Sequence, residues 1–230
     1  MIIFHNTINY ISCNICVYIT IAYKFGSASM KVQSLFITFV SVILASCYTP
    51  PNVERAAALS GNYQLDPAHA SVVWSISHVG LSNYTARFDD ISGTLSFDPL
   101  SPENSKVDIS IDPTSISTGD KEFDETISMD SSYFNAGKYS QIRFVSREIE
   151  ITGDNTGLIT GDLTFRGRIL PLTLNTVFNG AGKSFGHKGQ TLGFSATATL
   201  LRSDFGLTTL SGFGIGDEIT LRIETEFNEN

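Results

Sequence analysis

Cysteine and histidine are scarce in this chain, and their positions exclude several kinds of chemistry. All three cysteines, Cys13, Cys16 and Cys47, come before the region in which regular structure is expected. Residues 48–230 therefore have neither a disulfide nor a thiol nucleophile. The four histidines, at positions 5, 69, 78 and 187, lack the close spacing of a zinc or haem site. We predict no metal site and no cofactor.

The sequence motifs of common hydrolases and nucleotide-binding enzymes are also missing. There is no G-x-S-x-G nucleophile elbow, no H-E-x-x-H zinc motif and no phosphate-binding loop. Asp66 and His69 have no evident nucleophile beside them, and a capping or turn role suits them better. We predict that the protein is not an enzyme and has no catalytic residue. The alternative is a small-barrel enzyme that acts on a lipid in its interior.

Positive charge is sparse as well. The chain has 15 Lys and Arg against 23 Asp and Glu, which gives a net charge of -8. Two of the bases and none of the acids lie in residues 1–46, so the remainder has 13 bases, 23 acids and a net charge of -10. Binding to a nucleic-acid backbone requires concentrated positive charge, and we exclude nucleic acid as a partner.

The first 46 residues have the composition of a leader. Met30 and Lys31 precede an apolar run over residues 32–45, which is the layout of a secretory signal peptide. Residues 44–47 (LASC) resemble a bacterial lipobox, in which the cysteine becomes the lipidated first residue. We predict that residues 30–46 are a lipoprotein signal peptide and that Cys47 anchors the protein to a membrane. An ordinary signal peptide with an incidental cysteine is the alternative.

Residues 1–29 do not fit such a signal, because a signal should begin at the N-terminus. We interpret them as an over-extension of the reading frame; a transmembrane helix over residues 2–22 is the rival, weakened by His5 and several asparagines. The C-x-x-C in this stretch has no second pair, so we assign it no metal or redox role.

Residues 47–61 contain two adjacent prolines and are predicted to be a linker that holds the folded domain off the membrane. Tyr48, which follows the lipobox cysteine, is not the aspartate associated with retention in the inner membrane. We therefore expect the protein in the cell envelope, in the periplasm and anchored to the outer membrane.

Residues 63–227 consist of short segments in which apolar and polar side chains alternate. In residues 220–227, Leu221, Ile223 and Thr225 are separated by charged residues. Because side chains of a strand point to opposite faces with a period of two, this pattern indicates sheets with one apolar face. The predicted fold is all-β, a closed barrel of antiparallel hairpins over residues 62–230. Its interior is either a solid core or a lipid pocket.

One segment, residues 120–135, breaks the alternation. Phe123, Ile127 and Phe134 recur there at roughly helical intervals, so we expect one or two short helices across one end of the barrel. Residues 166–168 (RGR), between two predicted strands, indicate a tight turn or bulge.

Ordered motifs in this region resemble those of the YceI family. They lie at residues 63–72 (YQLDPAHASV), 77–80 (SHVG), 93–95 (GTL), 159–167 (ITGDLTFRG), 202–207 (RSDFGL) and 216–219 (GDEI). Each element alone is a weak signal, but the set follows the family's order from Tyr63 to about Phe227. The chain departs from the family at Asn135 and Ser140, where the family has aspartate and proline.

The resemblance implies an extended, lipocalin-like antiparallel barrel of about eight strands with a short helical cap. It also implies a lumen that binds a long amphiphilic lipid, typically a polyisoprenoid such as a polyprenyl phosphate or a quinone, and in some members a fatty acid or amide. Family members are usually periplasmic or secreted, and a homodimer is compatible with the resemblance.

The candidate lumen residues are the inward apolar positions of the strands and of the cap, which either contact the lipid or fill a solid core. They are Val72, Trp74, Ile76, Leu95, Phe97, Ile109, Ile111, Ile142, Phe144, Leu163, Phe165 and Phe194, with Phe123 and Phe134 from the cap.

Three polar residues are candidates for the lipid head group. His78 ends the same face as Trp74 and can hydrogen-bond a quinone carbonyl or a phosphate; a structural hydrogen bond is its alternative. Arg87 and Arg202 are possible phosphate contacts, because the guanidinium matches phosphate geometry. For Arg202, a structural ion pair with Asp204 is the alternative.

Overall fold

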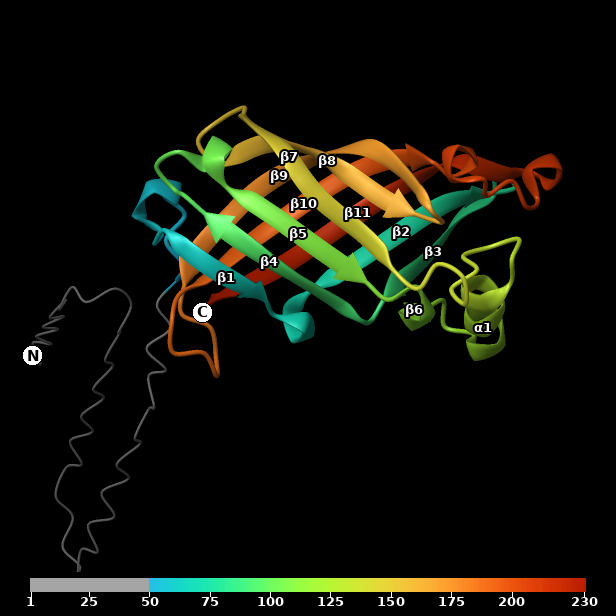
Figure 1. Cartoon of the computed structure of the whole chain (residues 1–230), viewed down its shortest axis with the longest axis horizontal. Helices are drawn as coiled ribbons and strands as arrows, with labels where there is room; N and C mark the ends of the chain where they lie inside the picture. Colours follow the sequence, from blue (N-terminus) through green and yellow to red (C-terminus); the bar gives the residue numbers. More distant parts are fainter. Residues whose placement is uncertain (1–49) are drawn as a thin grey trace, which may run out of the picture. The chain divides into compact units, whose positions relative to one another are not determined.

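Eleven strands, one α-helix and six short 3-10 helices make up residues 50–230, the part of the chain that this computed structural model describes (Figure 1). The strands are β1 (Gly61–Leu65), β2 (Ser71–His78), β3 (Ser82–Phe88), β4 (Ile91–Phe97), β5 (Lys106–Ile111), β6 (Ile116–Ser117), β7 (Ile142–Ile151), β8 (Thr156–Phe165), β9 (Arg168–Gly182), β10 (Thr191–Leu201) and β11 (Ile215–Glu229). The 3-10 helices are η1 (Arg55–Ala57), η2 (Pro67–His69), η3 (Pro102–Asn104), η4 (Pro113–Ser115), η5 (Arg202–Phe205) and η6 (Ser211–Phe213). The predicted leader and Cys47 lie outside the described residues.

Eight of these strands close into an antiparallel barrel. Their hydrogen-bonded order is β1-β4-β5-β7-β8-β9-β10-β11, and β11 returns to β1 through the pairs Tyr63–Glu229 and Leu65–Phe227. β2, β3 and β6 extend the sheet from another part of β11, where Leu221 pairs with Trp74. The prediction of an all-β barrel of about eight strands is confirmed.

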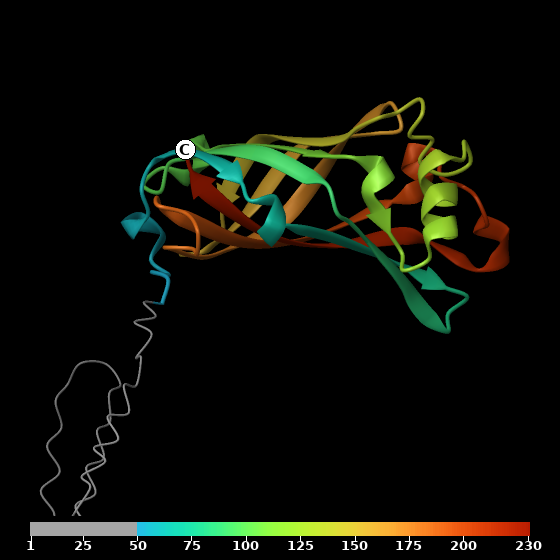
Figure 2. The same ribbon diagram turned by 90° about the horizontal axis from the view of Figure 1, so that it is seen from below.

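A single α-helix, α1 (Lys121–Met129), covers one end of the barrel among the described residues (Figures 1 and 2). Asp120 caps its N-terminus, since its side-chain carboxylate accepts hydrogen bonds from the backbone N–H groups of Glu122 (3.0 Å) and Phe123 (3.3 Å). Ile127 in the helix and Phe134 in the turns that follow it are buried against the barrel. The predicted helical cap is therefore present.

The predicted tight turn at residues 166–168 is a two-residue hairpin connection. β8 ends at Phe165, β9 begins at Arg168, and both intervening residues have a positive φ, 49° at Arg166 and 73° at Gly167. This is the backbone of the hairpin turns whose twist matches that of the strands. A Cβ at Gly167 would lie 2.7 Å from Cε1 of Tyr139, so only glycine fits there.

One end of the barrel is filled by four phenylalanines, which we call the aromatic plug: Phe97, Phe178, Phe194 and Phe227. Their ring centroids lie 5.4 to 6.0 Å apart, the spacing of favourable aromatic pairs. We call this the plugged end; the opposite end, beside α1, is the open end. Figures 1 and 2 show both ends, with the N-terminal part of the described chain and the C-terminus at the plugged end.

Residues 50–60, part of the segment predicted as a linker, lie against the plugged end. The backbone N–H of Asn52 donates to the carbonyl of Ala181 (2.7 Å), and the reverse hydrogen bond is 2.8 Å long. The N–H of Leu59 donates to Oε1 of Gln190 (2.8 Å), and the side chain of Ala58 is buried. Adjacent prolines are therefore compatible with an extended segment that is hydrogen-bonded to the barrel as well as with a spacer.

Tyr63 joins this docked segment to the barrel seam. Its side chain is fully buried, and its hydroxyl donates a hydrogen bond to the carbonyl of Leu59 (2.8 Å). Burial, reinforced by the negative charge of Glu229, raises the pKa of Tyr63 to about 12.

The raised pKa predicts that the barrel loses stability in alkali. In the unfolded chain Tyr63 ionises near its ordinary pKa of about 10, so unfolding releases a proton between about pH 10 and pH 12. The free energy of unfolding should fall across this window, and Tyr63→Phe should flatten the decline. Denaturant unfolding of both proteins at a series of pH values measures the two slopes. Equal slopes would contradict the buried, neutral phenol.

Candidate functional site

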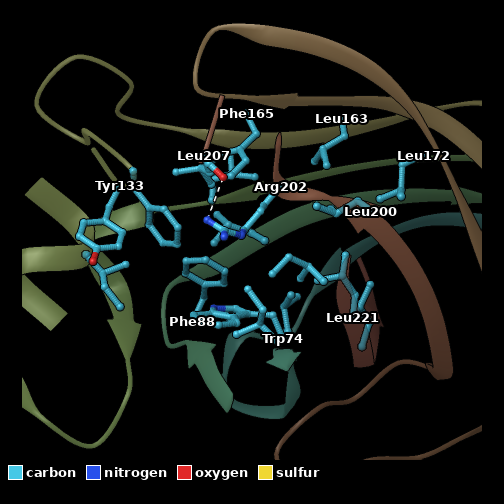
Figure 3. Close-up of a pocket in the computed structure, with 18 of the residues that line it drawn as sticks. Trp74, Phe88, Tyr133, Leu163, Phe165, Leu172, Leu200, Arg202, Leu207 and Leu221 are labelled. Carbon is cyan, nitrogen blue, oxygen red and sulfur yellow. Dashed lines mark hydrogen bonds between the residues drawn. The ribbon is translucent and has the colours of Figure 1, made fainter. Parts of the chain in front are cut away.

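An apolar cavity occupies the barrel between the aromatic plug and the open end. Its volume is about 340 Å³, within the range of about 300–1,000 Å³ that is usual for ligand pockets. Figure 3 shows side chains from many strands pointing into this space, among them Trp74, Leu172, Leu200 and Leu221. Almost the whole wall is aliphatic or aromatic, so the cavity suits a hydrocarbon and offers little to a polar solute.

Most of the predicted lumen residues line this cavity. They are Val72, Trp74, Ile76, His78, Ile109, Ile111, Phe123, Phe134, Ile142, Phe144, Leu163 and Phe165.

Three predicted lumen residues belong to the solid core instead. Phe97 and Phe194 are members of the aromatic plug, and Leu95 is buried with them in the core. They point inward as predicted. Alternation shows which face of a strand is inside, but it does not show how far along the barrel the side chains fill the interior.

Other lining residues were missed in the sequence. Leu221, Ile223 and Thr225 of β11 line the cavity, and their alternation with charged residues already carried that signal. Leu207 and Leu210 also line it, but they lie in the loop after β10, where no periodic pattern identifies them.

His78 lies at the open end of the cavity. It is the last residue of β2, pairs with Ile215 of β11 and lines the cavity while remaining exposed. Its ring makes no hydrogen bond to any other residue in the described part of the chain, so the alternative of a structural hydrogen bond finds no support there. His78 is thus a polar lining side chain with hydrogen-bonding capacity available at the open end, and the hydroxyls of Tyr84 and Tyr133 also belong to the lining.

Arg202 forms part of the cavity wall, but its guanidinium is fully engaged with the protein. The side chain is buried, and all five of its N–H donors have acceptors. The acceptors are the carbonyls of Gly216 (2.7 Å from Nε), Leu207 (2.9 Å from Nη1), Thr209 (2.6 Å from Nη1) and Ile215 (3.3 Å from Nη2), and the hydroxyl of Ser211 (3.1 Å from Nη2). Figure 3 shows the bond to Leu207.

Both earlier interpretations of Arg202 are therefore corrected. No N–H donor is left for a phosphate, and the side chain makes no ion pair with Asp204, whose backbone carbonyl instead accepts a hydrogen bond from Arg168. The engaged carbonyls belong to residues 207–216, the loop that borders the open end. Arg202 holds this loop in place.

Arg87 is likewise corrected as a head-group contact. Its side chain is half exposed on the outside of the barrel, and its Nε lies 2.7 Å from a carboxylate oxygen of Asp89. It does not line the cavity.

Asp66, His69 and Glu226 form a polar cluster outside the barrel. One carboxylate oxygen of Asp66 accepts from the N–H of Ala68 (3.0 Å), and the other lies 3.0 Å from Nδ1 of His69. The hydrogen bond with His69 lowers the pKa of Asp66 and raises that of His69. Asp66 also accepts from Asn228, so its oxygens are already occupied and the cluster acts as the predicted cap of η2.

The fold and its cavity define a class of protein, a lipocalin-like barrel with an apolar interior site. The chain belongs to the YceI-like domain family, whose model matches residues 63–227. The resemblance found in the sequence motifs is thereby confirmed. Among residues 50–230, no helix has the length and hydropathy needed to span a bilayer.

Relatives and solved structures agree with this assignment. A UPF0312 protein of Pseudomonas putida is 38% identical over 173 residues, which cover 74% of this chain and 86% of the relative. The crystal structure of a YceI protein of Campylobacter jejuni has a TM-score of 0.60 and 32% identity, covering 67% of this chain and 90% of that one. A polyisoprenoid-binding domain of Saccharophagus degradans, implicated in plant cell wall breakdown, shares the fold at 17% identity and a TM-score of 0.52, covering 73% and 98%.

The Arg202 network predicts a large cost of substitution. Arg202→Met would leave five acceptors without a donor in a buried site, so the free energy of unfolding should fall by about 3 kcal/mol or more. Arg87→Met removes only an exposed ion pair and should cost less than about 1 kcal/mol. Chemical denaturation measures the free energy of unfolding of both variants. Equal losses of stability would contradict the structural role of the Arg202 network.

Proposed function

We propose that the protein binds a long-chain amphiphilic lipid, with a polyisoprenoid such as a polyprenyl phosphate or a quinone as the ligand class. The hydrocarbon chain lies in the cavity and the polar head lies at the open end, beside His78. The observation that carries the proposal is the long apolar cavity. Its burial of a hydrocarbon chain supplies roughly 25 cal/mol for each Å² removed from water.

The cavity has room for an extended hydrocarbon chain along the barrel. Lining positions on β11 run from Ile215 to Thr225, about 33 Å along the strand and about 25 Å along the barrel axis at a usual strand tilt. The polyisoprenoid-binding description of the Saccharophagus degradans domain, which shares the fold, is in keeping with this proposal.

The residues that line the cavity suit a protein that binds its lipid without converting it chemically. The cavity is lined by His78, Arg202, Tyr84 and Tyr133 but by no aspartate, glutamate, lysine or cysteine of the described chain. Arg202 is fully engaged, and the wall has no carboxylate to orient or activate His78 as a catalytic base. We therefore propose a carrier or storage protein.

Native mass spectrometry of the purified protein tests whether a lipid is bound. The bound molecule is then extracted and identified. We expect one long-chain lipid per barrel. An empty barrel, after purification under conditions that retain lipids in known lipid-binding barrels, would refute the proposal. Chemical conversion of the extracted lipid by the protein would favour an enzyme instead.

Two adjacent residues of β11 provide a matched pair for the cavity. Leu221 lines it, whereas Thr220 is exposed on the outer face. Leu221→Glu places a carboxylate among hydrocarbon side chains and should lower lipid retention more than tenfold, while Thr220→Glu should leave it unchanged. Lipid content measured by mass spectrometry compares the two.

A third variant covers the case in which Leu221→Glu fails to fold. Leu221→Trp fills the cavity without adding charge and should also displace lipid. Full lipid content in a folded Leu221→Trp protein would contradict the position of the site.

We also propose that Cys47 is acylated and holds the protein at the periplasmic face of the outer membrane. The support is the LASC stretch at residues 44–47 after an apolar run. Two acyl chains or more are needed for stable anchoring, as lipoproteins provide. Cys47→Ser should move the protein from the membrane fraction to the soluble fraction, measured by fractionation and by labelling with a radioactive fatty acid. Unchanged membrane fractionation would discredit the anchor.

A further inference from the structure

Two loops at the open end of the barrel expose large apolar side chains. The β2–β3 turn contributes Val79 and Leu81, and the loop that contains η6 contributes Leu210 and Phe213. Leu81 is 88% exposed and Phe213 is 75% exposed. We call these four side chains the rim. Figures 1 and 2 show both loops at the same end of the molecule as α1.

The two loops of the rim are held together by hydrogen bonding and are not independent of each other. The backbone N–H of Val79 donates to the carbonyl of Gly214 (2.9 Å), which ties the two loops together. The guanidinium of Arg202 donates hydrogen bonds to the carbonyls of Thr209 and Ile215, which hold the loop that contains η6. Val79 and Leu210 also have positive φ values, 53° and 62°, where large side chains are costly. The fold thus keeps apolar side chains at positions that favour glycine or asparagine.

The rim has no charge of its own, although the folded part of the protein is strongly acidic. Residues 71–86 and residues 205–216 contain no aspartate, glutamate, lysine or arginine. His78 is the single titratable group in these two stretches besides Tyr84. An acidic protein is repelled by an anionic lipid surface, and charged side chains resist transfer into hydrocarbon. The rim loops themselves avoid both costs, whereas α1 at the same end carries acidic residues, Glu122 and Asp124, in its first turn.

The rim is continuous with the cavity. Leu210 lines the cavity and is also half exposed, and His78 lines it directly before Val79. A hydrocarbon chain that leaves the cavity at this end therefore passes from apolar wall to apolar rim.

We propose that the rim is a bilayer-docking surface, through which the lipid ligand enters and leaves the cavity. The proposal rests on the lipid ligand proposed above. Docking places the open end in the hydrocarbon region, so the chain of the ligand moves between cavity and bilayer without exposure to water. A protein partner fits less well, because stable protein interfaces surround their apolar centre with polar groups and use arginine anchors. The rim loops do carry exposed polar side chains, Ser82 and Thr208 among them, but they offer no exposed arginine as an anchor.

A fluorescent label on a single cysteine tests this contact. In the full chain with Cys13, Cys16 and Cys47 replaced by serine, Phe213→Cys or Phe185→Cys introduces the only thiol, which is labelled with an environment-sensitive dye. Phe185 is the matched control, because it is exposed in the loop between β9 and β10 at the plugged end. Both proteins carry the same leader, so binding through residues 1–46 is common to them.

With phosphatidylcholine vesicles that contain nitroxide-labelled lipid, we expect several-fold stronger quenching at position 213 than at position 185, with little effect of salt. Equal or stronger quenching at 185 would overturn the proposal. So would a label at 213 that is already buried without vesicles and responds to protein concentration, because the rim would then be a contact between two copies of the chain.

A transfer measurement supplies the second readout. Leu81→Ser with Phe213→Ser leaves the cavity lining intact and should slow transfer of a fluorescent polyprenyl lipid between vesicles by about tenfold or more. Native mass spectrometry of the same samples separates the two proposals. If the double variant binds lipid and transfers it at an unchanged rate, the docking role of the rim is refuted but lipid binding is not. If the barrels contain no lipid, the lipid-binding function itself is refuted.

Discussion

The structure depends on the way a single long strand, β11, divides one of its edges between two partners. Its other edge is paired with β10 over eleven residue pairs. On the shared edge, β2 pairs with residues 215–224 and β1 with residues 227–229. The chain crosses between these partners at η2, where the backbone N–H of Asp66 donates to the carbonyl of Glu226 (2.9 Å). The Asp66–His69 cap stabilises the crossing, which accounts for a polar cluster with no role in the cavity.

This division also separates the solid half of the barrel from the hollow half. β1 pairs with β4, and the wall that they form with β11 faces the aromatic plug. β2 pairs with β3, and their apolar side chains face the cavity together with those of α1. Because β6 pairs with β3 over only two residues, the sheet stops there, and the helix and its following turns cover the remaining side. The cap is thus part of the cavity wall.

The predictable features of this protein are those that a repeating pattern encodes. Alternation gave the inward face correctly for residues as different as Ile109 and Phe97, because the pleat of a strand has a period of two. It could not separate them, since the end of the cavity depends on which aromatic rings meet across the barrel. Arg202 was misjudged for a related reason: four of its five acceptors are backbone carbonyls, which every residue type carries, so the sequence does not show which of them the guanidinium meets. The contacts of residues 50–60 with the barrel were not predictable, because proline occurs in a docked extended segment as readily as in a spacer.

The positions of the proposed anchor and of the open end restrict how the protein works at a membrane. Asn52 is fixed to the plugged end, and five residues of extended chain bring Cys47 at most about 18 Å from it. The barrel measures about 35 Å along its axis, judged from the 15 residues of β11 at a usual tilt. With Cys47 acylated, the tether is too short for the rim to enter its own bilayer end-on. With this anchor, an upright barrel holds the rim away from the bilayer that carries Cys47, and the bilayer that the rim docks to is then a second one.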